Sequence, residues 1–499
     1  MRPTTSVRRN LAAGVLGDGW AVLIQIAFVP VYVKLLGIEG YGLIGAVAIL
    51  FALFAVLDSA LAPAISRVVA RALAGARPIR EARTLLRSVE ILLLAVAIVI
   101  ATFGFVTAEW LVERWLRIEA LDVSSVAAAL RLFAFQVAIR LFVAIYRAVL
   151  VGAQELVWLS AFAAGFATLR GAGVVPILWA WPGIEAFFAF QALVTVLEAG
   201  FLGRKAWSLL SDPGRAWFSL AALGEIRRFS VGVAVMTILW QALHHSDKAL
   251  LSAMLPLADV GRYALASSAA AGLALIVGPF ASVAFPRLTE LAARGDNAAL
   301  SAEFHQLAQM VVLTLAPVAW VVALFAEPLL FAWTRDGVLS SGASPFLAVL
   351  AIAGLLKGCM TLPYTLQLAT GRSRAIAGSY AAMLVVFVPS TYFGSMAHGA
   401  IAAAYAWVGV TVLALAMALP LLSASLSVAQ ASRWLGWDVA VPIAAAGLGA
   451  GLVRSMVEPE ASGYAMAAGI VGALLASLAF TALVLPGLRA RRLSIEGLT

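Results

Sequence analysis

The chain has 499 residues, of which 63% are hydrophobic and only 12% are charged, and it carries a formal net charge of +9. This composition, with a mean hydropathy of +1.00, excludes a protein that folds and works in water. The apolar residues form 14 stretches, most of them close to the length that a helix needs to cross a bilayer. We therefore predict an all-α polytopic membrane protein with about 14 transmembrane helices.

The predicted spans follow one another with short connections. In chain order they are 11–36, 42–68, 88–108, 123–151, 157–178, 183–203, 229–254, 263–285, 307–327, 346–368, 376–396, 399–423, 439–456 and 464–486. Continuous apolar runs favour helices, because the strands of a membrane barrel would alternate with a period of two. The first run resembles a signal peptide, but it is too long, contains Asp18 and leads into further spans.

The distribution of basic residues predicts the orientation. If the N-terminus is cytoplasmic, the loops and tails on that side hold 22 of the 34 Lys and Arg residues, whereas the opposite loops hold six. This asymmetry places both termini in the cytoplasm. The positive charge is then a topology signal that also attracts anionic lipid, so we do not expect nucleic-acid binding. The single cysteine, Cys359, excludes an internal disulfide and a cysteine-based metal site.

Away from the span ends, which are counted with the loops, six basic residues fall inside the spans: Arg131, Arg140, Arg147, Arg170, Lys248 and Lys357. Each costs roughly 2.5–3.5 kcal/mol at the centre of a membrane helix, so each needs a compensating environment. Gln136, Arg140 and Arg147 lie at positions i, i+4 and i+11, within about 40° of one another on one helix face. They are therefore predicted to form a polar stripe. Arg131 lies on the opposite face near the outer end, where it is expected to snorkel to the interface.

Four acidic residues also fall inside the spans, away from the span ends: Asp18, Asp58, Glu198 and Asp247. One interpretation makes them structural partners of the arginines. The other makes them ion-coupling sites that titrate or bind a cation, and Asp18 is the foremost candidate because Gly17 and Gly19 leave room beside it. Depth counting places Asp18, Asp58 and Glu198 in the cytoplasmic halves of their spans. Arg140 and Arg170 are therefore expected to have fewer acidic partners nearby and to face an aqueous cavity that holds an anionic substrate.

A weak internal repeat divides the chain. AISRVVARALAG at 64–75 aligns with AFPRLTELAARG at 284–295, and both segments leave a span on the cytoplasmic side. Upstream, LGIEGYG at 36–42 and LPLADVG at 255–261 form short outer turns at nearly the same offset. Six predicted helices separate the copies, so the repeat is parallel and its halves are related by an axis along the membrane normal.

Five segments carry a resemblance to a known family: FVPVYVKLLGIEGYGLIG at 28–45, LDSALAPAISRVVAR at 57–71, HSDKALLSAMLPLADVGRYALA at 245–266, FPRLTELAARGD at 285–296 and LPYTLQLATGRS at 362–373. The chain resembles the polysaccharide transporters of the multidrug/oligosaccharidyl-lipid/polysaccharide (MOP) superfamily, the Wzx-type O-antigen and exopolysaccharide flippases. The resemblance implies a V-shaped, MATE-like pair of six-helix lobes with a central cavity. The predicted lobes are 1–210 and 211–430, followed by two more helices and a cytoplasmic tail at 431–499.

The resemblance also implies a function in the bacterial inner membrane. The expected substrate is an oligosaccharide on undecaprenyl pyrophosphate, flipped from the cytoplasmic to the periplasmic leaflet. The drive is left open between H+, Na+ and substrate mass action. The predicted substrate-binding residues are Gln136, Arg140, Arg147, Arg170 and Lys357, because arginine suits bidentate contacts with phosphate or carboxylate. No catalytic residue, cofactor or metal is expected. The expected partners are the bilayer and the glycan polymerase and chain-length proteins of the same pathway.

Three alternatives remain open at this stage. A drug or cation antiporter of the same superfamily would share the fold, but it typically has twelve helices and a more acidic cavity. A lipid II flippase would share both the fold and the helix number. A membrane-embedded glycan polymerase would be an enzyme and usually needs a large periplasmic loop, whereas the longest outer loop predicted here, 328–345, has only 18 residues.

Overall fold

The computed structural model describes residues 17, 19–212, 214, 217–458 and 463–485, without the side chains of 49–60, 222, 223 and 225–234. Throughout this part of the chain the regular structure is helical, apart from a single bridge between Arg117 and Pro256. The all-α prediction is therefore confirmed. By its internal contacts the chain forms two compact units, Met1–Gly261 and Arg262–Thr499. The lobe boundaries at 210 and 430 stay predictions.

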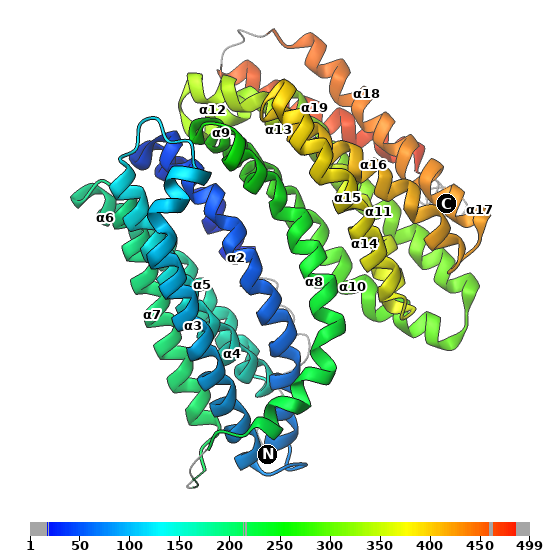
Figure 1. Ribbon diagram of the computed structural model, residues 1–499. Helices are drawn as coiled ribbons and strands as arrows, with labels where there is room; N and C mark the ends of the chain where they lie inside the picture. Colours follow the sequence, from blue (N-terminus) through cyan, green and yellow to red (C-terminus); the bar gives the residue numbers. More distant parts are fainter. Residues whose placement is uncertain (1–16, 18, 213, 215–216, 459–462, 486–499) are drawn as a thin grey trace. The chain divides into compact units, whose positions relative to one another are not determined.

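The first unit begins with a helical segment at 19–27. Its further helices are α2 (Val29–Leu73), α3 (Ile79–Trp115), α4 (Val123–Gly152), α5 (Leu156–Ala172), α6 (Val174–Ala180), α7 (Ile184–Leu209) and α8 (Leu220–Met254). Helices α3, α4, α5 and α7 run side by side (Figure 1). Helix α9 (Leu257–Ala271) crosses the boundary between the two units.

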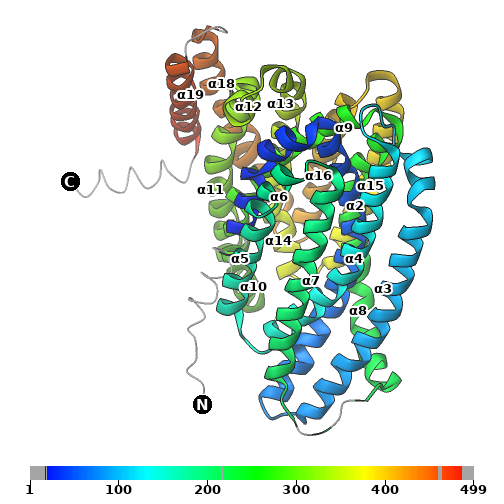
Figure 2. The same cartoon turned by 90° about the vertical axis from the view of Figure 1, so that its left-hand side faces the viewer.

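The second unit contains α10 (Leu273–Arg294), α11 (Asn297–Leu324), α12 (Ala326–Thr334), α13 (Gly337–Cys359), α14 (Thr361–Ala369), α15 (Ser373–His398), α16 (Ile401–Ser423), α17 (Val428–Arg433), the π-helix η1 (Trp434–Ala440), α18 (Val441–Met456) and α19 (Gly463–Val484). Helices α18 and α19 pack against each other and both contact α11 (Figure 2). Trp320 of α11 donates a hydrogen bond to the carbonyl of Ile443 at 2.9 Å, which fixes this contact.

Twelve helices among the described residues are long and apolar enough to cross a membrane, so the predicted number of 14 is not confirmed. The predicted spans 42–68 and 229–254 lie on α2 and α8, the two helices that contain the undescribed side chains. Other helices exceed their predicted spans. Helix α3 has 37 residues although the apolar run covers only 88–108, because hydropathy marks the part of a helix that lies in hydrocarbon and not its polar ends.

The structure supports the internal repeat at the two segments that are predicted to be cytoplasmic. Gly75, just after α2, has a φ of 77°, and Gly295, just after α10, has a φ of 70°. Both helices end in a Schellman motif: the amide of Ala76 donates to the carbonyl of Arg71, and the amide of Asp296 donates to that of Leu291. Glycine adopts the required left-handed conformation without strain. The aligned glycines therefore have the same structural role.

The outer turns of the repeat contact each other reciprocally. A Cβ on Gly42 would lie 2.0 Å from the carbonyl oxygen of Leu257, and a Cβ on Gly261 would lie 2.2 Å from that of Ile38. Ile38 and Leu257 are the third residues of the two aligned turns, and the glycines are the seventh. Equivalent residues thus make equivalent contacts, as expected for two copies related by a twofold axis. Gly37, with a φ of 75° and a ψ of 168°, breaks α2 at the predicted turn.

Glu39 in the first outer turn holds the loop that precedes α4. Its carboxylate accepts hydrogen bonds from the amides of Glu119 at 2.7 Å, Ala120 at 2.7 Å and Leu121 at 3.1 Å. The same loop reaches the second outer turn, because the amide of Leu257 donates to the carbonyl of Arg117 at 3.1 Å. The Glu39 carboxylate and one backbone hydrogen bond therefore join the two outer turns and this loop into one cluster.

Candidate functional site: a cationic cavity in the first unit

A cavity of about 700 Å³ lies among the helices of the first unit. Its described lining comes from the helical segment 19–27 and from α2, α3, α4, α5, α7 and α8. The polar side chains of this lining are Gln25, Tyr32, Gln136, Arg140, Arg147, Arg170, Gln191, Glu198, Gln241 and His245. Three arginines and one carboxylate leave the described lining with an excess of positive charge.

Arg170 and Glu198 form a buried ion pair in the cavity wall. Arg170 lies in the last turn of α5, and its Nη2 donates to Oε2 of Glu198 on α7. Only 19% of the Arg170 side chain and 7% of the Glu198 side chain are exposed. The expectation that Glu198 lies too far toward the cytoplasm to pair with Arg170 is wrong. Counting residues along the helix axis neglects the long arginine side chain, which can bridge about one helical turn of 5.4 Å.

Helix α7 presents a polar stripe that the sequence analysis missed. Nε2 of Gln191 donates to the backbone carbonyl of Arg170 at 3.3 Å, and Nε2 of Gln136 donates to Oγ1 of Thr195 at 3.4 Å. Gln191, Thr195 and Glu198 lie at i, i+4 and i+7, which places them on one helix face. This spacing was available in the sequence and could have revealed the stripe. The two helix faces that meet here, on α4 and α7, are both polar.

The predicted stripe on α4 is confirmed as geometry, since Gln136, Arg140 and Arg147 all line the cavity. Their role in substrate binding stays a prediction. Among the described residues, Arg147 forms no hydrogen bond or ion pair, although its side chain is only partly exposed. Arg131 lies on α4 outside the cavity lining, and its Nη2 is 2.7 Å from Oε1 of Glu109. Of the arginines in the lining, Arg147 thus presents to the cavity a guanidinium group that makes no hydrogen bond or ion pair among the described residues.

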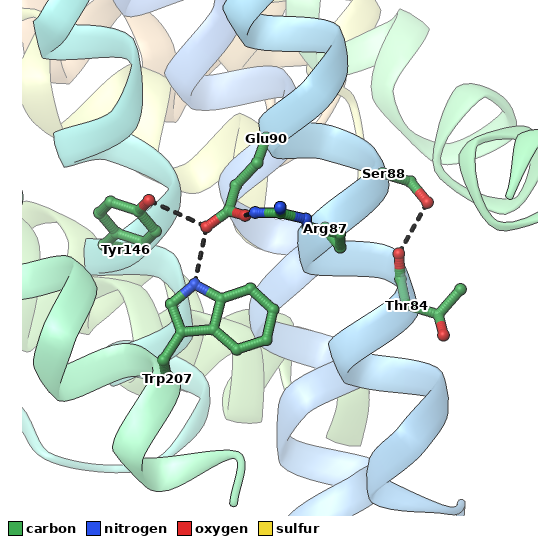
Figure 3. Close-up of polar contacts among 6 residues, drawn as sticks. All are labelled: Thr84, Arg87, Ser88, Glu90, Tyr146 and Trp207. Carbon is green, nitrogen blue, oxygen red and sulfur yellow. Dashed lines mark hydrogen bonds and ion pairs between the residues drawn. The ribbon is translucent and has the colours of Figure 1, made fainter. Parts of the chain in front are cut away.

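A second buried carboxylate, Glu90 on α3, supports α4 and α7 beside the cavity (Figure 3). Oε1 of Glu90 accepts hydrogen bonds from the hydroxyl of Tyr146 at 2.9 Å and from Nε1 of Trp207 at 2.7 Å. Nη1 of Arg87 lies 3.1 Å from Oε2. Tyr146 precedes Arg147 directly on α4, so this network fixes the part of the helix from which Arg147 projects. Neither Glu90 nor this role of Tyr146 was predicted from the sequence.

The remaining predicted residues lie elsewhere. Lys357 belongs to the second unit, where its Nζ lies 5.4 Å from the centre of the Trp407 ring. Asp247 is buried on α8 and is not among the cavity lining; its Oδ2 lies 4.0 Å from Nζ of Lys248. Asp18 lies outside the described residues. Asp58 lies on α2, but its side chain is outside the described part of the structure.

The chain has the fold of the MOP-superfamily transporters, as solved structures show. Lipid II flippase MurJ in an inward closed conformation matches with a TM-score of 0.76 at 12% identity, over 94% of this chain and 97% of that chain. An inward-facing multidrug resistance MATE family transporter matches with a TM-score of 0.68 at 14% identity, over 83% and 96%. A MOP-superfamily transporter from Pyrococcus furiosus matches with a TM-score of 0.56 at 15% identity, over 85% and 95%.

The sequence itself gives the family. Residues 7–292 match the model of a family described as "Polysaccharide biosynthesis protein". The chain belongs to this family. No curated protein sequence matches it.

Proposed function

We propose that the protein is a flippase that moves an oligosaccharide on undecaprenyl pyrophosphate from the inner to the outer leaflet of the bacterial cytoplasmic membrane. The observation that carries this proposal is the cationic cavity among apolar helices, with Arg147 available to an anion. A pyrophosphate and a sugar chain cannot cross hydrocarbon unaided, whereas a polyprenyl tail is soluble in it. The protein then needs only a polar, positively charged path beside the lipid, and it acts as a transporter and not as an enzyme.

The chemistry of the lining suits both parts of such a head group. Arginine guanidinium groups bind phosphate oxygens in a bidentate manner, and Arg147 and Arg140 project from the same face of α4. The amides of Gln25, Gln191 and Gln241 can each donate to and accept from sugar hydroxyls. In this proposal Arg170 has a positioning role as well, because its ion pair with Glu198 fixes α5 against α7.

The conformational cycle is proposed to be alternating access, with O-antigen, exopolysaccharide or capsule synthesis as the pathway. The coupling ion is proposed to be H+ or Na+, bound at Asp18, Asp58 or Asp247. Glu198 is the weakest of the four candidates because Arg170 engages its carboxylate. Glycan polymerase and chain-length proteins are the proposed partners. An ion at such a site can drive the cycle only if its affinity differs between the two conformations.

A lipid II flippase is the second candidate, favoured by the likeness to MurJ over 94% of this chain. The two substrates share the polyprenyl pyrophosphate and differ in the glycan. Transport assays in proteoliposomes with each substrate distinguish them. Faster transport of lipid II than of the oligosaccharide would favour the second candidate.

The test of the cavity is Arg147→Ala. Loss of one charge-assisted contact to phosphate, worth about 1.5–3 kcal/mol, should slow transport of the lipid-linked oligosaccharide roughly tenfold to a hundredfold. Arg147→Lys should recover only part of the rate, because lysine keeps the charge but not the bidentate geometry. Transport is measured in proteoliposomes, together with complementation of a flippase-null strain.

The matched control is Arg131→Ala, because Arg131 lies on the same helix but outside the cavity lining. This variant should transport at the normal rate, and all variants should reach normal membrane levels. Unchanged transport by Arg147→Ala would remove Arg147 from the site. The double variant Arg170→Ala/Glu198→Ala removes both members of the buried ion pair, so that neither charge is left unpaired. A normal membrane level without transport would show that this pair is needed for transport and not only for folding.

A further inference from the structure

The segment that joins α7 to α8 carries a group of exposed apolar side chains, here called the linker patch. Its members are Trp217, which is 65% exposed, Phe218, which is 46% exposed, and Leu220, which is 74% exposed. In the sequence they fall in the loop between the predicted spans 183–203 and 229–254, where water would surround them. Single exposed apolar residues are ordinary, whereas several large ones side by side mark a surface that binds lipid or protein.

Side chains of α3 hold this segment. Nη1 of Arg83 donates to the carbonyl of Leu210 at 3.2 Å, directly after α7. The amide of Ser219 donates to Oγ of Ser88 at 2.9 Å. The same hydroxyl donates to the carbonyl of Thr84 at 2.7 Å (Figure 3). Because Ser219 lies between members of the linker patch, the patch lies against α3 at the level of Ser88.

Helix α3 indicates where the hydrocarbon begins. Ser88, Ile91 and Leu92 lie at i, i+3 and i+4 and therefore share one helix face. Ile91 is 42% exposed and Leu92 is 44% exposed, and exposed apolar side chains continue along the helix as far as Trp110. This run is the part of α3 that faces lipid. Three residues separate Ser88 from Ile91, so at 1.5 Å per residue the linker patch lies about 4.5 Å outside the hydrocarbon.

This depth corresponds to the interfacial layer of a bilayer. The hydrocarbon core is about 30 Å thick and the whole bilayer about 40–45 Å, which leaves about 5–7 Å of head-group region on each side. Tryptophan is enriched in this layer because its ring is apolar and its N–H group can still reach water. A segment at this depth can bury apolar side chains in lipid while its backbone stays hydrated.

Positive charge lies at the same level. Residues 77–90 contain four arginines and two glutamates. Arg87 is the neighbour of Ser88, and 54% of its side chain is exposed although its Nη1 lies 3.1 Å from Oε2 of Glu90. A guanidinium group has five N–H donors, so this ion pair leaves donors for a second anion. The phosphates of anionic lipids attract basic residues in this layer.

We propose that the linker patch inserts into the interfacial layer of the leaflet on the predicted cytoplasmic side, with Arg87 bound to the phosphate of an anionic phospholipid. The patch then anchors the start of α8, the helix whose Gln241 and His245 line the cavity. The connection between the two predicted spans is thus bound to lipid and does not lie free in water. This anchor does not depend on the identity of the transported substrate.

Depth-dependent quenching in proteoliposomes of phosphatidylcholine and phosphatidylglycerol tests the insertion. Trp217→Cys is labelled with a fluorophore; the native Cys359 is 3% exposed, and the unsubstituted protein gives the background. A nitroxide at the top of the lipid acyl chain should quench this label more strongly than iodide in the water on both sides of the vesicle. The control Glu81→Cys lies on α3 about 10 Å further from the hydrocarbon than Ser88, and it should show the reverse order.

Head-group preference tests the contact of Arg87. Nitroxide-labelled phosphatidylglycerol should be enriched beside the label at Trp217→Cys about fivefold over nitroxide-labelled phosphatidylcholine, the factor for one basic residue at the membrane surface. Arg87→Gln should abolish most of this preference. Arg77→Gln removes the same charge before the start of α3 and should leave the preference unchanged.

Two results would overturn the proposal. Iodide quenching at Trp217→Cys as strong as at Glu81→Cys would place the linker patch in water. Equal quenching by the two labelled lipids, or an unchanged preference in Arg87→Gln, would exclude the contact with anionic lipid. If Trp217→Cys does not reach the membrane, Phe218→Cys carries the same tests, because its side chain belongs to the same patch.

Discussion

Glu90 accepts hydrogen bonds from side chains of α4 and α7 while its own helix is α3. Its partners Tyr146 and Trp207 lie 56 and 117 residues away in the sequence. Such partners cannot be derived from the local pattern. In the sequence Glu90 lies at the edge of a predicted span, where a carboxylate facing water is ordinary. In the structure Glu90 is buried between helices, and its position in the sequence does not indicate this.

Replacing Glu90 by alanine should destabilise the protein. The hydroxyl of Tyr146 and the indole N–H of Trp207 would lose their acceptor in a largely buried position, which should lower the free energy of unfolding by about 2 to 4 kcal/mol. Glu90→Gln should cost less, because the amide oxygen still accepts both bonds. Thermal unfolding in detergent measures the difference.

The control for Glu90 is Glu81→Ala on the same helix. Glu81 is exposed and lies 3.6 Å from Arg77 in a surface ion pair, which is worth less than about 1 kcal/mol. Equal unfolding temperatures for Glu90→Ala and Glu81→Ala would show that the buried network contributes nothing to stability.

Arg170 shows a second limit of sequence reasoning at the residue scale. Its presence inside a span was correctly identified as a position that needs compensation, and the polar face of α4 was predicted from spacing alone. The partner, Glu198, was placed at the wrong depth. Spacing determines the angle of a side chain around a helix, whereas the pairing of two helices depends on packing that only the tertiary structure defines.

At the scale of elements, helices and turns were predicted more securely than contacts. The break at Gly37 lies in the predicted outer turn, and the helix ends at Gly75 and Gly295 match the aligned repeat segments. Turns are local, and glycine marks them because of its conformational freedom. Helix lengths were underestimated, since hydropathy does not extend to polar ends such as residues 79–87 of α3.

The reciprocal turn contact predicts that Gly42→Ala and Gly261→Ala each destabilise the first unit. Each new methyl group would meet a backbone carbonyl oxygen, at 2.0 Å and 2.2 Å respectively, which cannot move without its turn. Overpacking of this kind costs typically about 1–3 kcal/mol. Thermal unfolding and yield from membranes report the loss.

Gly200→Ala is the matched control, because a Cβ on Gly200 has no neighbour within 4 Å. In the middle of α7 this change should leave stability unchanged or raise it slightly. If Gly42→Ala and Gly261→Ala are as stable as Gly200→Ala, the two turns accommodate the added methyl groups without loss of stability.

At the scale of the whole molecule, the all-α membrane fold followed from composition and apolar run length alone. The cavity could not be predicted from composition and run length, because it depends on which faces of six helices and of the segment 19–27 meet. The residues that line it come from positions 21 to 245, and each of them is compatible with several arrangements when it is considered alone.

The orientation in the membrane is tested by reporter fusions. Fusions after residues 80, 215 and 490 should report the cytoplasm, and fusions near 117 and 458 should report the periplasm, because 22 basic residues lie on the first side and six on the second. A fusion at 117 with a periplasmic signal also serves as the positive control for the reporter. A periplasmic signal at 80 or 490 would reverse every assignment of side.

The reciprocal contact of Gly42 and Gly261 also has an evolutionary consequence. A pair of identical residues that make reciprocal contacts, as Gly42 and Gly261 do, is the pattern of a symmetric homodimer. It is the pattern expected if the gene arose when a shorter gene for a self-associating ancestor was duplicated and fused. An ancestor with an even number of spans has both ends on one side, so fusion would join the copies in the same orientation without an added helix. The two glycines would then descend from a single codon, and both would be retained because each allows the other turn to approach closely.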